Sequence, residues 1–544
     1  MMKRFEVLAG FVILLLLGVA VRPQSLTVTD VQTIIAQAVS KAVALGQPVT
    51  VSVTDKEGHL LGTFQMTGAP ANTLVRSVGR AGQGLENISV PSQFASISKA
   101  GTAAILSSGG NAFSTRTASF IIQEHFPPGI DNTPGGPLYG VQFSTLKCSD
   151  IAIAGLPLGL SGDAGGYPIY KNGVAVGGVG VEGDGLYTVD RVPTDLDQPG
   201  EEVIAIAAVR GFDTPNLIRA DNILVAGIRL QFANLANPSV PTQIPFGSLP
   251  GAVIDPILAA PASDFIPRTL NGVSGQASVR FPTIAGSSLT AAEVDQILGN
   301  AAATANITRA AIRQPIGSNA RVSMSVVDTD GRVLGVFRQF DAPVFGLDVA
   351  VQKARSVNFF SRNDAAAKLN AAGMGSYVTR AAADGIALNG TIAFSDRGLG
   401  FLHRPLFPDG INGTAAGPFS TLLADWSPFN NGLQLDLVKN AILTMPICRT
   451  AAYTKREMLP PCPCTMVPEL KNGSQIFAGA VPLYRGNTLI GAIGISGDGI
   501  EQDDLIAAGG AAGFAPPEAM RSDQVFVRNV RLPFLKFPPR PFLP

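Results

Sequence analysis

The chain has 544 residues, which is room for two or more ordinary domains, each with its own core. Hydrophobic residues make up 46% and exclude a mostly disordered chain, whereas charged residues, at 15%, are fewer than in most soluble proteins. The 40 Lys and Arg residues balance the 40 Asp and Glu residues, so no net charge attracts nucleic acid or an anionic membrane. The 60 Gly and 40 Pro residues predict many turns and long loops.

The first 20 residues have the order of a secretory signal peptide. Lys3 and Arg4 precede an apolar run from Val7 to Val21, and Gly18-Val19-Ala20 offers small residues for cleavage. A retained membrane anchor is the alternative, but the run is shorter than the roughly 20 residues that span a bilayer. The sequence therefore predicts cleavage of residues 1–20 and an exported protein, periplasmic or extracellular, with no membrane segment afterwards.

An amphipathic helix is predicted directly after the signal. Apolar residues recur at helical spacing from Val31 to Leu45, and Thr27 and Asp30 stand where an N-cap and its third residue belong. The same pattern returns in the second half, where Thr290 and Glu293 precede another apolar helix. We expect each helix to cover a core with its apolar face.

A hairpin follows each of these helices. Residues 49–64 read V-T-V-S-V-T-D-K-E-G-H-L-L-G-T-F, and residues 322–337 read V-S-M-S-V-V-D-T-D-G-R-V-L-G-V-F. Alternating apolar residues around a short turn are typical of a hairpin. Asp55 and Asp328 occupy matching positions, so the register indicates a tandem duplication.

The clearest repeat is a glycine-rich hairpin near the end of each copy. Residues 168–185 read P-I-Y-K-N-G-V-A-V-G-G-V-G-V-E-G-D-G, and residues 482–499 read P-L-Y-R-G-N-T-L-I-G-A-I-G-I-S-G-D-G. Both copies also carry a Phe-Ser-x-Arg motif, which ends at Arg116 and at Arg397. The predicted organisation is a first domain at 26–232, a Pro/Ala-rich linker at 233–287, a second domain at 288–535 with a cysteine-containing insertion, and a Pro-rich tail at 536–544.

These motifs resemble the GlcG/HbpS-like family, a haem-binding, DUF336-type group that includes the C-terminal domain of PduO-type adenosyltransferases. The resemblance rests on the opening helix, on S-V-V-D-T-D-G-R-V-L-G-V-F-R-Q-F-D-A-P from Ser325, on Lys353-Ala354-Arg355 and on the glycine-rich hairpin. The first copy keeps the pattern more loosely, with Gln65-Met66-Thr67-Gly68-Ala69 where the family has an R-M-D-G-A type sequence.

The resemblance implies an α/β (α+β) fold. Each of two tandem, profilin-like domains would have a central antiparallel sheet covered by helices. It also implies haem or a related tetrapyrrole as the ligand, and either a homo-oligomer or an intramolecular pair of domains.

Haem needs an axial ligand such as His, Met, Cys or Tyr, and the three histidines do not repeat between the copies. His125 and His403 lie in apolar, proline-flanked segments, where a histidine of the core or of a loop is the alternative. The repeated cations could bind ligand carboxylates, or they could pair with Asp184, Asp498 or the acids that start the next helix. The candidate ligand-binding residues are Lys99, Arg116, His125 and Asp184 in the first copy and Lys353, Arg355, Arg397, His403, Tyr484 and Asp498 in the second.

The four cysteines are Cys148, Cys448, Cys462 and Cys464. A bridge from Cys448 to Cys462 or Cys464 would close a loop of about 15 residues and contribute roughly 3 kcal/mol of stability. The C-x-C pair Cys462 and Cys464 also suggests a zinc site, but no His or acidic cluster in the sequence would complete the four zinc ligands. The pairing is not determined by the sequence.

The sequence gives little support for a nucleotide site or for the common hydrolase motifs. Residues 178–183 match G-x-G-x-x-G, but they follow a hairpin, Ala492 replaces the first glycine in the second copy, and the next helix starts with acids that would repel a pyrophosphate. The sequence contains no G-x-S-x-G, H-E-x-x-H or Walker motif.

The sequence thus predicts a protein that binds a small anionic or planar ligand, with haem as the leading candidate, in a binding or sensing role rather than in catalysis. The alternatives are a structural or interaction module and an enzyme that acts on a small organic acid. If one copy alone is functional, we expect it to be the second, since it lies closer to the family pattern.

Overall fold

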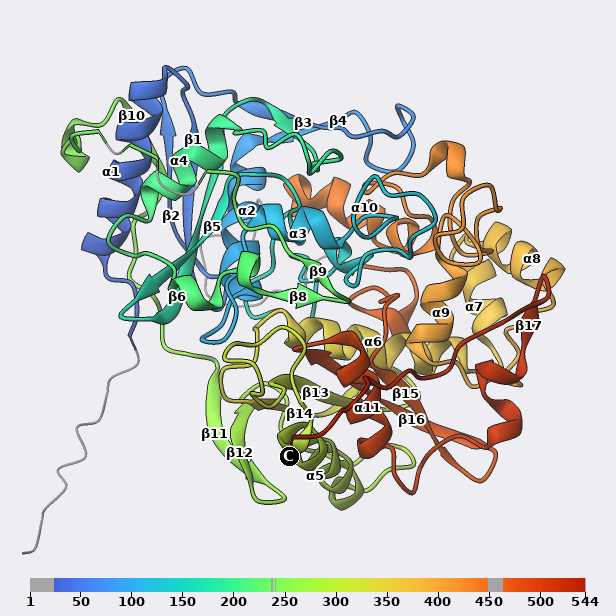
Figure 1. Cartoon of the computed structure of the whole chain (residues 1–544). Coiled ribbons are helices and arrows are strands. Elements are labelled where there is room, and N and C mark those ends of the chain that lie inside the picture. The colour runs from blue at the N-terminus through green and yellow to red at the C-terminus, as the bar shows by residue number, and fades with distance from the viewer. Residues whose placement is uncertain (1–23, 236–237, 240, 449–462, 544) are drawn as a thin grey trace, which may run out of the picture.

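The first copy is built on a five-stranded antiparallel sheet. In the computed structural model, which describes residues 24–235, 238–239, 241–448 and 463–543, the strand order is β10-β2-β1-β6-β5 (Figure 1). Helices α1 and α4 cover one face of this sheet and α2 covers the other. The bounds are α1 (Val28–Leu45), β1 (Thr50–Asp55), β2 (Leu60–Met66), α2 (Ser92–Leu106), β5 (Gly166–Lys171), β6 (Val174–Glu182), α4 (Gly200–Ala208) and β10 (Gly251–Asp255).

The second copy repeats this arrangement with one more strand. Its antiparallel sheet has the order β11-β12-β14-β13-β16-β15, with α5 and α11 on one face and α6 on the other. The bounds are β11 (Phe265–Leu270), β12 (Val273–Ser278), α5 (Ala291–Ile307), β13 (Val322–Val327), β14 (Val333–Gln339), α6 (Gly346–Phe360), β15 (Ala480–Arg485), β16 (Thr488–Gly497) and α11 (Ile500–Gly510). The prediction of two tandem α/β units, each with an antiparallel sheet covered by helices, is confirmed.

Shorter elements surround the two sheets. In the first copy they are β3 (Asn72–Val75), β4 (Ile88–Pro91), α3 (Thr115–Ile121), β7 (Leu186–Tyr187), β8 (Leu224–Val225) and β9 (Ile228–Arg229). In the second copy they are α7 (Ala365–Ala371), α8 (Gly375–Ala383), α9 (Asp396–Leu402), α10 (Leu433–Cys448), β17 (Phe526–Val527) and β18 (Val530–Arg531).

Local sequence signals explain the starts of the cover helices. The Thr27 side chain accepts a hydrogen bond from the Asp30 backbone N–H at 3.2 Å, and the Asp30 carboxylate accepts one from the Thr27 N–H at 2.7 Å. Thr290 and Glu293 form the same capping box on α5. Both capping predictions are confirmed.

The repeated glycines of the second hairpin allow a helix to lie close to the sheet. A Cβ at Gly180 would lie 2.0 Å from the Ser96 carbonyl oxygen of α2, and one at Gly494 would lie 2.0 Å from the Ala350 carbonyl oxygen of α6. Only glycine fits such an approach. The G-x-G-x-x-G match is therefore a packing feature of strand β6 and not a phosphate loop.

The segment predicted as a Pro/Ala-rich linker contributes strands to both sheets. Within residues 233–287, β10 pairs with β2 of the first copy, and the β11–β12 hairpin pairs with β14 of the second. Backbone pairing at a sheet edge needs little apolar patterning, which is why composition indicated a linker. The Pro-rich tail also packs on the body, since the Arg309 N–H donates to the Pro541 carbonyl at 2.7 Å.

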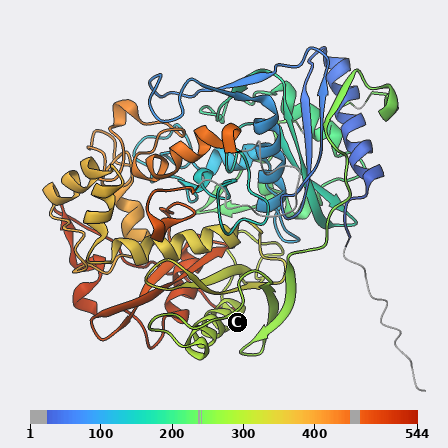
Figure 2. The same ribbon diagram turned by 180° about the vertical axis from the view of Figure 1, so that it is seen from behind.

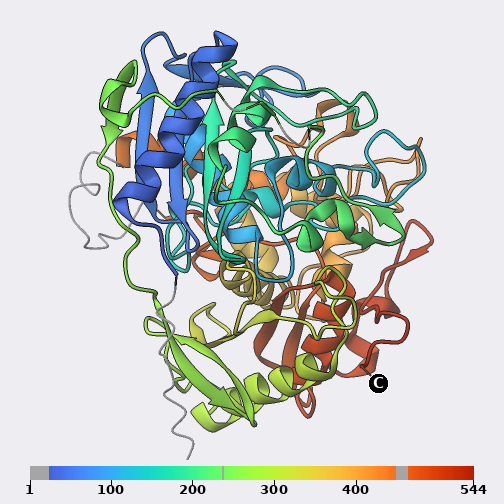
Figure 3. The same cartoon turned by 60° about the vertical axis from the view of Figure 1, so that its left-hand side comes forward.

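The long insertions of the two copies meet and contribute to the contact between them. The Trp426 indole N–H donates to the Tyr139 hydroxyl at 2.8 Å, and the two rings stack. On α6, Asp348 accepts a hydrogen bond from the Thr145 N–H at 2.6 Å, and Arg355 holds Asp150 with two bonds of 2.8 Å. Figures 2 and 3 show the blue-to-green first copy directly against the yellow-to-red second copy.

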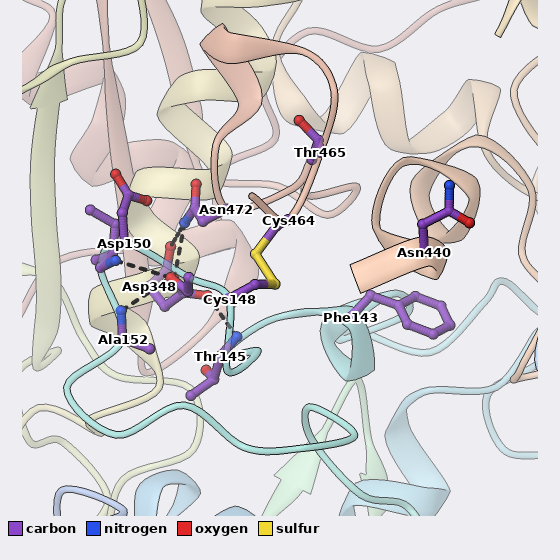
Figure 4. The surroundings of a disulfide bond; sticks show 12 residues. Phe143, Thr145, Cys148, Asp150, Ala152, Asp348, Asn440, Cys464, Thr465 and Asn472 are labelled. Carbon is purple, nitrogen blue, oxygen red and sulfur yellow. Dashed lines mark hydrogen bonds between the residues drawn. A yellow bond between two sulfur atoms is a disulfide. The ribbon is translucent and has the colours of Figure 1, made fainter. Parts of the chain in front are cut away.

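A disulfide between Cys148 and Cys464 joins these insertions (Figure 4). The two Cα atoms lie 5.1 Å apart, although 316 positions separate the residues in sequence. The suggested bridge from Cys448 to Cys464 is therefore wrong, because tertiary packing brings the other copy's cysteine to Cys464. Cys462 and the side chain of Cys448 lie outside the described residues, as does the predicted signal peptide.

No helix among the described residues combines the length and the hydropathy that a membrane crossing requires.

Loss of the disulfide should weaken the contact between the copies. We expect Cys148→Ser to lower the free energy of unfolding by about 2–5 kcal/mol, because the bond restrains a very long loop of the unfolded chain. Urea denaturation of the oxidised protein measures this. Cys464→Ser and the double variant should cost the same amount, and additive losses in the double variant would contradict the pairing.

Candidate functional site

Each copy buries one lysine between the sheet and the helix that follows it. Lys99 of α2 donates to the Val181 carbonyl at 3.0 Å and to the Glu201 carboxylate at 2.6 Å. In the second copy Lys353 of α6 donates to the Ile495 carbonyl at 2.8 Å and to Asp503 at 2.9 Å. Both lysines are fully buried, so they hold the fold together and are not exposed to a ligand.

The surroundings of the two lysines differ. Lys99 also contacts Asp163 and Glu182, each at 2.8 Å. Burial raises the pKa of Asp163 to about 8, even though Lys99 opposes the shift. Asp163, Glu182 and Glu201 are the one group of carboxylates in the described part of the chain close enough together to hold a metal ion, but the Lys99 ammonium already lies among them.

The repeated arginines also pair with acids at the start of the next helix. Arg116 donates from Nε to Glu202 at 2.7 Å, and Arg397 donates from Nε to Asp504 at 2.5 Å. The pairing with helix-start acids, which the sequence left open, is the arrangement found in both copies. In the second copy a pocket adjoins this arginine.

A pocket of about 410 Å³ opens at this point of the second copy. One side is a face of α9 and the residues after it, and the other side is the C-terminal segment around Phe534. The lining residues are Arg397, Gly400, Phe401, Arg404, Asp409, Ile476, Phe477, Ala478, Ile500, Asp523, Arg531, Pro533, Phe534, Leu535 and Lys536.

Two guanidinium groups at the pocket have buried nitrogens without a hydrogen-bond partner among the described residues, although Arg404 Nε is ion-paired with Asp409. The buried Nη2 of Arg397 makes no hydrogen bond to any described residue, and the same holds for Nε and Nη1 of Arg404. Arg404 is 9% exposed, lies 3.6 Å from Asp409 and packs over the Tyr139 ring. Buried N–H groups without an acceptor are costly, so they favour an anionic acceptor from outside the protein.

Buried acids lie behind the pocket. Burial raises the pKa of Asp503 to about 7 against the opposing charge of Lys353. Burial likewise raises the pKa of Asp396 well above its usual range, and neither of its oxygens has a hydrogen-bond partner in the described structure. Burial therefore disfavours the charged form of Asp396, and the arginines of the pocket pair with other acids, Arg397 with Asp504 and Arg404 with Asp409.

The other residues singled out from the sequence lie away from the pocket. Arg355 belongs to the contact between the copies, and Asp498 accepts hydrogen bonds from Arg313 and from the Arg321 N–H. Tyr484 is buried on β15, and Asp184 lies in an exposed turn.

Neither candidate histidine lines the pocket. His125 donates from Nδ1 to the Thr133 carbonyl at 2.8 Å. His403 is fully buried between Phe360 and Phe419 and donates from Nδ1 to the Leu399 carbonyl at 2.8 Å. The residues that sequence reasoning missed are Arg404, Arg531 and Lys536. The spacing of seven residues from Arg397 to Arg404, two helical turns, was the available signal.

His403 should make stability depend on pH. Burial lowers the pKa of His403 to about 4, so the folded protein keeps it neutral while the unfolded chain takes up a proton below its ordinary pKa of 6.5. Its stabilisation is complete above pH 6.5 and is lost as the pH falls toward 4. We expect wild type to lose about 3 kcal/mol more than His403→Ile between pH 7 and pH 4.

Urea denaturation at a series of pH values measures this difference. Isoleucine is the matched replacement because Ile122 occupies the equivalent position of the first copy. His59→Gln is a control of opposite sign: burial opposes the charged form, but the hydrogen bond and charge of Asp55 outweigh it and raise the pKa of His59. Identical pH profiles for wild type and His403→Ile would contradict the assignment.

The sequence matches the family model described as haem degrading protein HbpS-like over residues 26–81 and 449–512. The first region contains α1, β1, β2 and β3 of the first copy. The second contains β15, β16 and α11 of the second copy, together with residues outside the described part. A search of curated proteins found no match.

Several solved structures are similar to this chain. The structure of PduOC in complex with haem is 20% identical to this chain, with a TM-score of 0.23. The match covers 35% of this chain and 98% of the PduOC chain. Klebsiella pneumoniae protein ORFY has 21% identity, covers 35% and 92%, and has a TM-score of 0.22. A double mutant of Streptomyces reticuli HbpS has 21% identity, covers 39% and 99%, and has a TM-score of 0.21.

Identities and TM-scores this low carry no argument about ligand or activity. The family model, by contrast, matches one region in each half of the chain, and the two halves share their motifs and the order of their main elements. Each half of the chain thus contains a region that matches the HbpS-like family model, and the two halves are tandem copies of one unit.

Proposed function

We propose that this protein binds a planar ligand that carries carboxylates, of the haem and tetrapyrrole class, in the pocket of its second copy, and that it acts by binding or sensing. The unpartnered donors of Arg397 and Arg404 at one pocket are the observation that carries the proposal. Guanidinium groups bind carboxylates with paired, charge-assisted hydrogen bonds. The ligand's carboxylates would accept these hydrogen bonds.

The remaining walls fit the ring of such a ligand. Phe401, Phe477 and Phe534 contribute aromatic surface, and Ile476 and Ile500 add aliphatic surface. Small-molecule sites are usually clefts of a few hundred Å³ that combine apolar walls with polar groups, and the surface of this pocket is about equally polar and apolar. Arg531 and Lys536 lie at the exposed side of the pocket, where Lys536 pairs with Glu501 and a second carboxylate would find the Arg531 cation.

The lining does not fit coordination of haem iron by the protein. Haem ligands from proteins are His, Met, Cys or Tyr side chains, and the described residues that line the pocket include none of these. His403 faces Phe360 and Phe419 instead. We therefore assign recognition to the carboxylates and the ring face of the ligand.

Export of the protein is part of the proposal. The Cys148–Cys464 disulfide supports an oxidising compartment, since such bonds persist mainly in secreted and periplasmic proteins. The expected signal peptide at residues 1–20 agrees with this location.

The role of the carboxylates is tested with metal-free protoporphyrin IX. We expect it to bind the protein saturably, with an affinity similar to that of haem, because the pocket offers nothing to the iron. Its dimethyl ester should bind at least tenfold more weakly, since esterification removes the charge that the arginines contact. Fluorescence titration measures both affinities. Equal binding of the acid and the ester would overturn the proposal.

The role of Arg404 is tested by Arg404→Gln, which installs the residue that the first copy carries at Gln123. Loss of a charge-assisted hydrogen bond of about 1.5–3 kcal/mol should weaken protoporphyrin binding about 10- to 100-fold. Arg485→Gln is the matched control, because Arg485 lies exposed at the β15–β16 turn and pairs with Glu293. Unchanged binding in a folded Arg404→Gln protein would exclude this pocket.

A further inference from the structure

We infer that the first copy contains the same carboxylate site and that its own acidic insertion occupies it. This inference rests on the proposed function of the second copy. The insertion lies between β6 and α4: fifteen residues separate Gly185 from Glu201, whereas three separate Gly499 from Asp503. The additional residues follow the glycine-rich hairpin that the two copies share.

The insertion lies on the helix face that lines the pocket in the second copy. By register from the Phe-Ser-x-Arg motif, Arg397, Gly400 and Arg404 correspond to Arg116, Ser119 and Gln123. All three first-copy residues bind Asp190. Its carboxylate accepts from Arg116 Nη1 at 2.8 Å, its N–H donates to Ser119 Oγ at 2.9 Å, and its carbonyl accepts from Gln123 at 2.6 Å.

The residues of the first copy that correspond to the opposite wall of the pocket also bind the insertion. Pro533 and Lys536 correspond to Gln231 and Asn234 in the segment after the last short hairpin. Gln231 donates to the Pro193 carbonyl at 2.6 Å, and Asn234 donates to the Asp197 carboxylate at 3.1 Å. Both walls of the first copy therefore hold the insertion where the second copy has open space.

The insertion also shows which chemistry the site accepts. Arg116 Nη2 donates to the Asp197 carboxylate at 2.9 Å, so two aspartates of the insertion satisfy the guanidinium. In the second copy Arg397 Nη2 finds no acceptor among the described residues. The carboxylates of Asp190 and Asp197 thus occupy the positions that we assign to the carboxylates of a bound ligand.

The insertion lies at the surface and not in the core. Residues 194–198 are exposed, and the side chain of Asp197 is 45% exposed. One end is fixed by the pairing of β7 with β3, and the other enters α4. Neutralising its two aspartates removes the charges that hold it on Arg116, and Glu202 remains as the internal partner. The backbone bonds of Asp190 to Ser119 and Gln123 remain, so shortening the insertion is the more complete change.

The experiment counts the protoporphyrin IX molecules that bind one full-length chain. We expect one tight equivalent for wild type. The Asp190→Asn/Asp197→Asn variant, whose new side chains have the same shape, should bind a second equivalent about 10- to 100-fold more weakly, because the first copy has Gln123 where the second has Arg404. Asp195→Asn is the matched control, because Asp195 lies in the same insertion and accepts a bond from the Asp197 N–H but, among the described residues, none from Arg116, so this variant should keep one equivalent. Adding Arg404→Gln to the double variant should weaken one of its two equivalents at least tenfold.

A second variant covers the case in which the double variant does not fold. Replacing residues 186–200 with the Ile-Glu-Gln of residues 500–502 gives the first copy the short connection of the second, and it too should bind two equivalents. One equivalent in wild type and one in the folded variant with the short connection would overturn the inference and leave the proposed function intact. No saturable binding by wild type or by the variants would overturn the proposed function itself.

Discussion

The buried cations that tie each sheet to the helix after it are the constraint on which the rest of the structure depends. Lys99 and Lys353 each join a long helix to a strand carbonyl and to an acid of the next helix. Removing one partner would leave a charge without compensation in the interior, which typically costs about 3–5 kcal/mol. The pairs persist in both copies, although the second copy has Phe477 and Ser496 where the first has Asp163 and Glu182.

The arginines next to these lysines have different surroundings in the two copies. The arginine beside each lysine bonds an acid of the same helix start, and its outer donors face a space between the short helix and the C-terminal segment. A twelve-residue difference in the connection before α4 and α11 decides what lies in that space. In the first copy it is the chain's own carboxylates, and in the second it is a pocket with unused donors.

The contact between the copies depends on segments that look irregular in sequence. Residues 137–165 and 419–476 contribute the Tyr139–Trp426 stack, partners of Asp348 and Arg355, and the Cys148–Cys464 disulfide. One hydrophobic core includes residues of both halves. The two copies are therefore packed together as one unit and are not independent domains joined by a linker. Long loops in a compact protein commonly serve contact or function, and here they serve contact.

The sequence by itself determined the duplication, the capped helices, the hairpins and the importance of Lys99, Lys353, Arg116 and Arg397, because local patterns and repeated positions record them directly. Only the tertiary structure decided that Cys464 pairs with Cys148, that residues 251–278 extend both sheets, and that Arg404 lines a pocket while His403 does not. These features depend on residues brought together from distant positions and on which face of a helix turns inward. The spacing of apolar residues along the sequence does not specify such contacts. Backbone pairing at sheet edges and the paths of long loops depend little on local composition.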